Sequence, residues 1–213
     1  MVNDAAIEAP TGTPIVYIID DDRSVRDALA DLLASVSLAC RCYATPADFL
    51  ADRIAPVPSC AVLDVRVPGM TGLDLHRLMR ERRMMLPVIF ITGHGDIAMG
   101  VEAMKNGAIE FLPKPFRDHD LLSAIQRGLE LDRQRLQDQA TLDALRMRWK
   151  SLTPGEQDVV LLVVGGLLNK QIAAQLRLSE ITVKVRRAHA MHKLQVRSLA
   201  ELVRLLARLD EIS

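Results

Sequence analysis

The first half of the chain alternates short apolar runs with segments of helical periodicity, and most of the runs end in a polar residue. The helical patterns occupy 25–36, a segment that opens at Thr45-Pro46, 73–83 and 96–106. The apolar runs lie at 15–19, 39–43, 60–63, 87–91 and 109–112. Strands that are apolar along their whole length are typical of parallel sheets covered on both faces. The pattern therefore predicts an α/β fold with a five-stranded, parallel, doubly wound sheet.

The polar residues that follow these runs form a chemically capable set. In an open parallel sheet, sites lie at the carboxyl ends of the strands. We therefore expect three carboxylates, a hydroxyl and an ammonium group to meet at one edge. Unpaired carboxylates repel one another, and oxygen ligands suit Mg²⁺ (or Mn²⁺). The residues are Asp20, Asp21, Asp64, Thr92 and Lys114.

Such a set is equipped for phosphoryl transfer. A carboxylate beside a divalent cation can act as the nucleophile and form an acyl phosphate, while the metal and Lys114 offset charge on the transferring oxygens. Each residue alone also has an ordinary explanation, because Asp20 to Asp22 read equally well as a solvated turn with a helix cap. The convergence of five such residues favours the functional interpretation.

The second half of the chain is helical and basic. Residues 1–128 hold 13 Lys and Arg against 17 Asp and Glu, a net charge of −4, whereas 129–213 hold 14 against 10, a net charge of +4. Only the basic half suits a polyanionic partner. Residues 118–148 predict one long helix, which we interpret as the last helix of the first domain extending into a linker.

Helix start signals divide the rest into four short helices. Capping boxes are expected at Thr153-Pro154-Gly155-Glu156 and at Ser198-Leu199-Ala200-Glu201, with Asn169 and Ser179 as further caps. The segments 169–176 and 180–194, joined by 177–179, have the lengths of a helix-turn-helix. Helical spacing places Ile181, Ala188, Met191, Leu194 and, partly, Val185 inward, and Lys184, Arg186, Arg187 and His189 outward. A solvated basic face on a small helical bundle fits the charges equally well.

Four segments of the first half resemble the signature regions of receiver domains in two-component signalling, which have a flavodoxin-like fold. They are IIDDDRSVR, VLDVRVPGMTG, VIFITGHGD and GAIEFLPKPF. The resemblance implies that Asp64 is the phosphoacceptor. It also implies that Asp21, Asp64 and the backbone carbonyl of Arg66 bind magnesium, with Asp20 acting through water.

The same resemblance assigns a switch. Thr92 and Phe111 match the family's hydroxyl and aromatic pair, and Lys114 would contact the phosphate, with a cis Lys114-Pro115 bond. Gly93, where alanine is common elsewhere, resembles the FixJ-like group. Haloacid-dehalogenase phosphatases, the enzyme alternative, need an acid two residues after the nucleophile. Arg66 stands there and cannot serve, so we expect no enzyme.

Residues 150–206 resemble the LuxR-type DNA-binding domain, most specifically in NKQIA and TVKV. The resemblance implies that Lys184, Val185 and Ala188 lie at the base edges. Phosphate neighbours would be Lys170, Thr182, Arg186 and Arg187. The dimer face would be Leu199, Leu202, Val203 and Leu206, a stripe that in isolation fits a core equally well. Gly155 replaces the family's usual arginine, and Arg186 and His189 replace histidine and asparagine.

Together these features predict a NarL/FixJ-type transcriptional regulator. A sensor histidine kinase would phosphorylate Asp64, which would promote homodimerisation and binding to double-stranded promoter DNA, with RNA polymerase as a further partner. The alternative is a phosphorylation-independent DNA-binding protein whose receiver serves as a scaffold. The three cysteines, Cys40, Cys42 and Cys60, lack the spacing of a metal or redox site, and no run is long and apolar enough to span a membrane. We therefore expect a cytoplasmic protein. The expected domains are a disordered leader (1–13), a receiver (14–128), a helical linker (129–150) and a DNA-binding domain (151–213).

Overall fold

The computed structural model describes residues 12–93 and 97–210 and divides the chain into two compact units. The first unit ends at Gln137 and the second begins at Asp138. Most of the expected leader, residues 1–11, lies outside the described residues. Within the described parts of the chain, no helix combines the length and the apolar character needed to cross a membrane.

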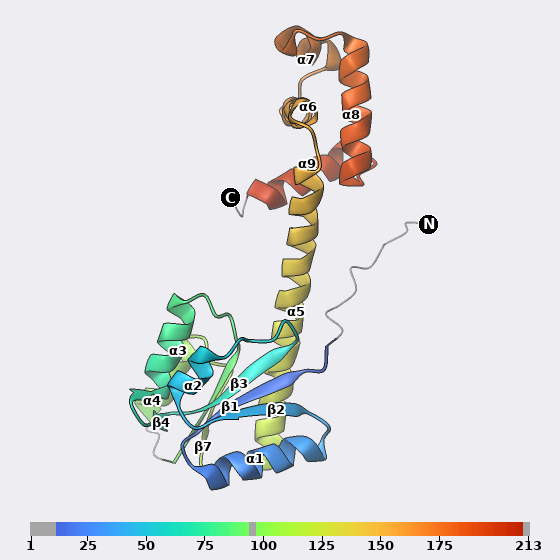
Figure 1. Ribbon diagram of the computed structural model, residues 1–213. Helices are drawn as coiled ribbons and strands as arrows, with labels where there is room; N and C mark the ends of the chain where they lie inside the picture. The colour runs from blue at the N-terminus through green and yellow to red at the C-terminus, as the bar shows by residue number, and fades with distance from the viewer. Residues whose placement is uncertain (1–11, 94–96, 211–213) are drawn as a thin grey trace. The chain divides into compact units, whose positions relative to one another are not determined.

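The first unit is built on the predicted five-stranded parallel sheet (Figure 1). Its strand order is β2-β1-β3-β6-β7, and every neighbouring pair is parallel. The crossovers put helices on both faces, so the doubly wound α/β prediction is confirmed. The strands are β1 (Ile15–Ile19), β2 (Ala39–Tyr43), β3 (Ser59–Asp64), β6 (Val88–Thr92) and β7 (Glu110–Pro113).

Two apolar layers sandwich this sheet. Alternate residues of the strands point to opposite faces, so Val16 and Ile18 join one layer and Tyr17 and Ile19 the other. Helices α1 (Arg23–Ser35) and α5 (Asp118–Lys150) cover the first face. Helices α2 (Pro46–Ala51), α3 (Gly72–Glu81) and α4 (Ile97–Lys105) cover the second. Asp96, the expected first residue of α4, lies outside the described residues.

A small hairpin after β3 was not predicted. Strands β4 (Arg66–Val67) and β5 (Met70–Thr71) pair antiparallel around Pro68-Gly69. Gly69 has φ +86°, and proline followed by such a glycine is typical of a type II turn. With two residues in each strand, the hairpin is too short to leave a periodic signal in the sequence.

Helix α3 ends two residues earlier than predicted. The chain leaves the helix after Glu81 because Arg83 takes a left-handed conformation, φ +57°, and the N–H of Met84 donates to the carbonyl of Met79 at 2.8 Å. Such helix ends usually carry glycine. An arginine in that position gives no stop signal, and the periodicity therefore ran on to residue 83.

The first half of α5 packs against the sheet. Leu121, Ala124, Ile125 and Leu129 are buried against the strands. The carboxylate of Asp132, also buried, accepts a hydrogen bond of 2.9 Å from the N–H of Ser59 at the start of β3. This helix therefore remains part of the first unit's core to at least residue 132.

The second unit contains the four predicted short helices, α6 (Pro154–Val164), α7 (Asn169–Leu176), α8 (Glu180–Leu194) and α9 (Leu199–Asp210). They enclose one core, to which Leu145 at the end of α5 also contributes. The capping box of Thr153 and Glu156 is confirmed, and Ser179 caps α8. At α9, the Ser198 hydroxyl accepts from the N–H of Glu201, but the Glu201 carboxylate accepts from Arg197. The Ser198 half of the second box is therefore confirmed, while the return bond from Glu201 goes to the backbone N–H of the residue before the cap.

Two expectations for the second unit are wrong. Asn169 does not cap α7, because Leu168 is the cap residue and the Gln171 side chain accepts from its N–H. On α8, Leu194 is buried as expected and Met191 is half-buried, but Ile181 is 74% exposed and Val185 and Ala188 are also exposed. The other buried residues of this helix are Val183 and Ala190. Both registers satisfy a 3.6-residue period, and only packing against the neighbouring helices decides between them.

Candidate metal centre and nucleic-acid interface

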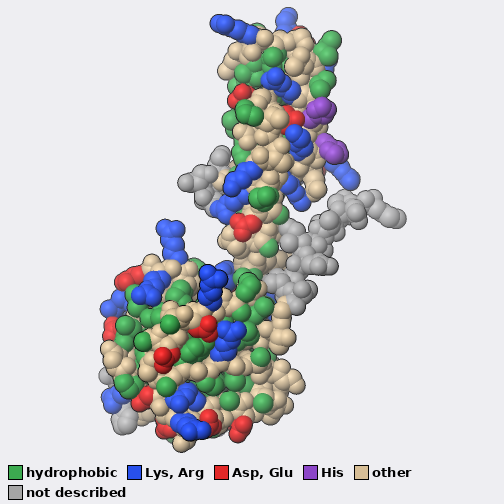
Figure 2. All heavy atoms as spheres, viewed as in Figure 1, with side chains coloured by type: hydrophobic (Ala, Val, Ile, Leu, Met, Phe, Trp, Pro, Cys, Tyr) green, Lys and Arg blue, Asp and Glu red, His purple; other side chains and the backbone are tan. Residues whose placement is uncertain are grey.

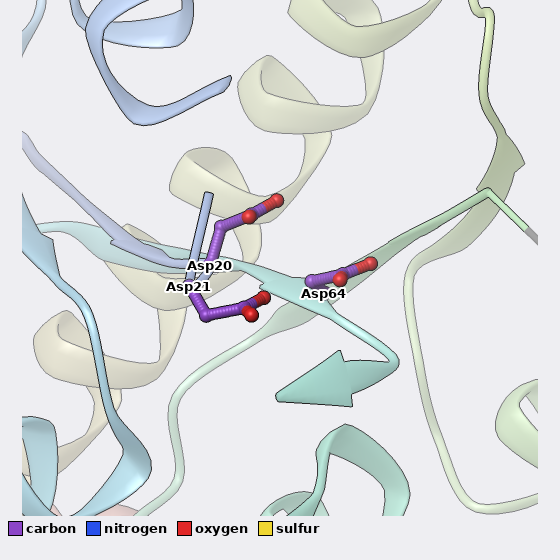
Figure 3. Close-up of side chains that lie close together, drawn as sticks. All are labelled: Asp20, Asp21 and Asp64. Atoms are coloured by element: carbon purple, nitrogen blue, oxygen red, sulfur yellow. The ribbon is translucent and has the colours of Figure 1, made fainter. Parts of the chain in front are cut away.

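Three carboxylates meet at the carboxyl edge of the sheet (Figure 3). Asp20 and Asp21 follow β1, and Asp64 ends β3. One oxygen of each carboxylate lies within 4.8 Å of those of the other two. The structure therefore brings together the three acids that the sequence pattern placed at one edge.

Local hydrogen bonds hold the first two acids in place. The buried Asp20 carboxylate accepts from the N–H of Asp22 at 2.8 Å, and Asp22 itself caps α1 by accepting from Ser24. The Arg26 guanidinium donates to the backbone carbonyls of Asp20 at 2.6 Å and Asp21 at 2.9 Å. The turn after β1 is thus fixed by the first turn of α1, which leaves the Asp21 side chain exposed.

Lys114 follows β7, the edge strand of the sheet, and its side chain extends to the cluster. Its Nζ lies 2.8 Å from Asp20 Oδ2 and 3.6 Å from Asp64 Oδ1. Its backbone N–H donates to the carbonyl of Thr92 at 2.7 Å, and the Lys114-Pro115 bond is cis, as expected. Lys114 therefore pairs with two of the three carboxylates, and even with Arg26 counted the cluster keeps an excess of negative charge.

Asp64 carries the feature that most clearly marks a binding site. Its Oδ1 is buried and has no hydrogen-bond partner among the described residues. Burial raises the pKa of the Asp64 carboxyl above its usual value; the nearby Lys114 opposes that rise and Asp20 adds to it. An unsatisfied buried carboxylate oxygen is costly unless another group compensates it. Oxygen ligands around excess negative charge fit a hard divalent cation.

Gly72 is a residue of this site that the functional reading of the sequence missed. A Cβ at this position would lie 2.3 Å from the carbonyl oxygen of Asp64. The Gly72 N–H donates to the carbonyl of Val65 at 2.8 Å, so the start of α3 presses directly against the end of β3. The sequence signal was the second glycine of VPGMTG, but only the fold shows that this glycine lies against the Asp64 carbonyl.

The remaining predicted receiver residues lie around the cluster. Thr92 is buried at the end of β6, and Gly93 follows it, exposed. Phe111 on β7 is half-buried, with its ring centroid 6.4 Å from that of Phe90. Arg66 points its side chain to solvent on β4. The contact of the Arg66 carbonyl with a metal stays a prediction.

The exposed face of α8 carries the residues assigned to DNA contact. Lys184, Val185 and Ala188 on α8 are exposed, as is Lys170 on α7. Figure 2 shows basic and histidine side chains along the surface of the second unit. Arg187 is half-buried, and its guanidinium lies 3.4 Å from the Asn169 side-chain oxygen. Thr182, also half-buried, contacts Ser179 through its hydroxyl at 2.8 Å. Arg187 and Thr182 thus also brace the helix-turn-helix.

Arg186 takes its position from the residue that departs from the family pattern. A Cβ at Gly155 would lie 2.4 Å from Arg186 Nη1 and 2.9 Å from Cζ. The guanidinium therefore fills the space above the first turn of α6, which any larger residue at 155 would occupy. Gly155 and Arg186, two departures from the family pattern that looked independent in the sequence, therefore pack against each other.

An ion pair between buried Glu156 and half-buried Lys193 ties α8 to the start of α6. The buried Glu156 carboxylate accepts from Lys193 Nζ at 2.7 Å and from the N–H of Thr153 at 2.8 Å. These bonds, that of Lys193 first, hold the pKa of Glu156 below its usual value. The sequence showed Glu156 as part of a capping box but gave no sign of Lys193, 37 residues away.

The expected dimer face on α9 is divided by the fold. Leu202 and Leu206 are buried in the unit's own core, while Leu199 and Val203 are 43% and 41% exposed. The two buried leucines are therefore core residues, which corrects the assignment of all four to an interface. Only Leu199 and Val203 remain available to a second copy.

Comparisons with known proteins agree on both units. Residues 16–126 match the response regulator receiver domain, and residues 150–206 match the bacterial regulatory proteins of the luxR family. Nodulation protein W of Bradyrhizobium diazoefficiens is 47% identical over 90% of this chain and 84% of its own length. Response regulator protein TmoT of Ectopseudomonas mendocina is 44% identical, over 92% and 90%.

Solved structures give the same result. The response regulator StyR is 47% identical and superposes with a TM-score of 0.83, covering 92% of this chain and all of that one. Full-length FixJ from Bradyrhizobium japonicum is 36% identical with a TM-score of 0.54, over 93% of this chain and 98% of that one. This chain therefore belongs to the FixJ-like branch of the two-component response regulators, which join a receiver domain to a LuxR-type DNA-binding domain.

Proposed function

We propose that Asp64 accepts a phosphoryl group from the phosphohistidine of a sensor kinase and that this controls promoter binding by the second unit. The proposal rests on the buried Asp64 Oδ1, which has no hydrogen bond among the described residues and lies 3.6 Å from Lys114 Nζ. A carboxylate oxygen free of hydrogen bonds keeps its lone pairs available as a nucleophile.

Mg²⁺ (or Mn²⁺) fits the same site. Asp21, Asp64 and the Arg66 carbonyl would hold it, with Asp20 acting through water. When bound, the ion supplies positive charge that offsets the charge on the transferring phosphoryl oxygens. Lys114 adds a second positive charge, and its bond to Asp20 holds it at the cluster.

The transfer itself needs little from the protein beyond position and charge. A bond forms between Asp64 Oδ1 and phosphorus as the phosphorus–nitrogen bond of the phosphohistidine breaks, and the imidazole leaves with the electron pair. No second carboxylate stands at position 66 to act as a general acid. The chain is accordingly proposed to hold the phosphoryl group as a signal and not to turn over a substrate as an enzyme.

The phosphorylated aspartate would be read by Thr92 and Phe111. Thr92 ends the strand next to Asp64, and the Phe111 ring is half-buried beside α4 on the next strand. A hydroxyl drawn toward the phosphate leaves room for the ring to follow, which moves β7 and α4 between two arrangements. Gly93, which follows Thr92 and is exposed, would lie next to the phosphate.

In the DNA-binding domain, Lys184, Val185 and Ala188 would meet base edges while Lys170, Thr182, Arg186 and Arg187 lie near phosphates. A homodimer formed through the phosphorylated receivers, with Leu199 and Val203 at a second contact, would place two α8 helices on a two-fold operator. RNA polymerase is the proposed partner at the promoter. We propose domain limits of 14–128, 129–150 and 151–213, with the linker's first turn packed on the receiver.

The phosphoacceptor is tested by intact-mass analysis after incubation with Mg²⁺ and a small acyl phosphate donor. The wild type is expected to gain one labile phosphoryl group, and Asp64→Ala none, because the nucleophile is gone. Asp31→Ala, which removes an exposed carboxylate of α1, is the matched control and should label like the wild type. Labelling of Asp64→Ala would refute the assignment, and no adduct on any variant would favour the scaffold alternative.

A further inference from the structure

Two cysteines lie side by side on the edge of the receiver sheet. Strand β2 is the outermost strand beside β1, and the register pairs Cys40 with Val16 and Cys42 with Ile18. Side chains two residues apart on a strand point to the same face. Both thiols therefore lie on the α1 side, where β2 neighbours α1 (Figure 1).

Both thiols are accessible to different degrees. Cys42 is exposed, and Cys40 is half-buried where it packs against the apolar layer below α1. The third cysteine, Cys60, is fully buried in β3. Burial raises the pKa of Cys42 to about 11, and the neighbouring Cys40 thiol adds to that rise.

Strand geometry decides what can join the two sulfurs. Residues two apart on a strand are separated by about 6.6 Å. A disulfide of about 2.05 Å needs Cβ atoms about 3.8 Å apart, so this pair cannot form one without distorting the strand. A bridging ion with two metal–sulfur bonds of about 2.3 Å each spans roughly 4.6 Å, which rotation about the side-chain bonds can supply.

The available ligands limit the ion. In the part of the chain that the structure describes, the only group of three His, Cys, Asp or Glu residues close enough to share an ion is the acidic cluster, so no third such residue joins the cysteine pair. Structural zinc needs four ligands, whereas soft monovalent ions accept two thiolates. We propose that Cys40 and Cys42 form a two-thiolate site for a soft cation of the copper(I) class.

The charges around the pair match this occupant. Binding releases two thiol protons to solvent and leaves a complex with one negative charge. The Arg26 guanidinium acts on Cys42 with a positive charge and Asp27 with a negative one, and Asp27 is also paired with Arg23 at 3.5 Å. Arg26 offsets the complex from α1 without giving up its bonds to the carbonyls of Asp20 and Asp21.

The test is an anaerobic titration of the full chain against copper(I) held by bathocuproine disulfonate, whose colour reports the copper withdrawn. The wild type is expected to bind one ion per chain. Cys40→Ser and Cys42→Ser should each weaken binding by at least about tenfold, because the second thiolate binds intramolecularly. Cys60→Ala, the matched control, should bind like the wild type.

If Cys40→Ser fails to fold, Cys42→Ser alone tests the site, because Cys42 is exposed and serine should fit there without loss of stability. Circular dichroism checks the fold of each variant. Wild-type affinity in folded Cys42→Ser would overturn the site. A stoichiometry of one ion per two chains would overturn it as well, because each copy would then supply a single thiolate.

Discussion

At the residue scale, single side chains take their roles from neighbours that the sequence does not place beside them. The sequence predicted which acids gather at the sheet edge, because strand ends of a parallel sheet must meet there. It did not predict that Asp64 Oδ1 lacks a hydrogen bond or that Gly72 presses on the Asp64 carbonyl. Both facts depend on distances between loops, and no periodicity encodes those.

Gly155 and Arg186 give the residue-scale prediction. Gly155→Ala forces the Arg186 guanidinium to move, and because only the end of a flexible side chain yields, stability should stay the same or rise slightly. Affinity for DNA should fall about fivefold, since Arg186 would leave its position near phosphate, a coupling of about 1 kcal/mol. Fluorescence anisotropy with a labelled duplex measures this.

The double variant supplies the control. In an Arg186→Ala background, Gly155→Ala should have no further effect on DNA affinity, because the side chain it displaces is absent. Equal losses in both backgrounds would mean that Gly155 acts independently of Arg186.

At the scale of the elements, sequence patterns placed every major helix and strand but failed where packing chooses between equal alternatives. Helix α8 has two apolar registers, and the fold buries Val183 and Ala190 where the pattern favoured Ile181 and Ala188. Helix α9 shows the same limit, because its apolar stripe contains two buried core residues, Leu202 and Leu206, and two exposed residues, Leu199 and Val203. An amphipathic pattern indicates that one face of a helix is buried, but it does not indicate which element that face packs against.

The Glu156–Lys193 pair gives the element-scale prediction. Glu156→Gln removes a buried carboxylate with two bonds, so it should lower the unfolding free energy by about 2 kcal/mol at neutral pH. Because the folded pKa lies below the ordinary value of 4.5, this stability is present above pH 4.5 and is lost as pH falls through the folded pKa. The wild type and variant should therefore converge in acid.

Urea unfolding of the full chain, followed by the fluorescence of Trp149, which is half-buried against the second unit's core, measures the difference. Asp158→Asn, an exposed change on the same helix, is the control and should alter stability little at any pH. A Glu156→Gln deficit that stays constant from neutral pH into acid would contradict the role of the carboxylate charge.

At the scale of the whole molecule, two units with opposite charge divide the work. The acidic receiver gathers carboxylates around Asp64, and the basic unit presents α8. The sequence predicted this division from the change in pattern after Asp118 and the change in charge after residue 128, with a helical linker at 129–150. The boundary between the two compact units lies within that linker, after Gln137, and Leu129 and Asp132 of the long helix α5 still pack on the sheet.

The central claim is that phosphorylation of Asp64 controls DNA binding, and one measurement tests it directly. The full chain is titrated onto a two-fold duplex selected from random sequence against the phosphorylated protein, with and without a small acyl phosphate donor and Mg²⁺. The donor should tighten binding of the wild type at least about tenfold, because dimerisation makes the second half-site contact intramolecular. Asp64→Ala should show no change, and Lys184→Ala should bind weakly in both states. Equal affinity of wild type and Asp64→Ala with the donor present would contradict the central claim.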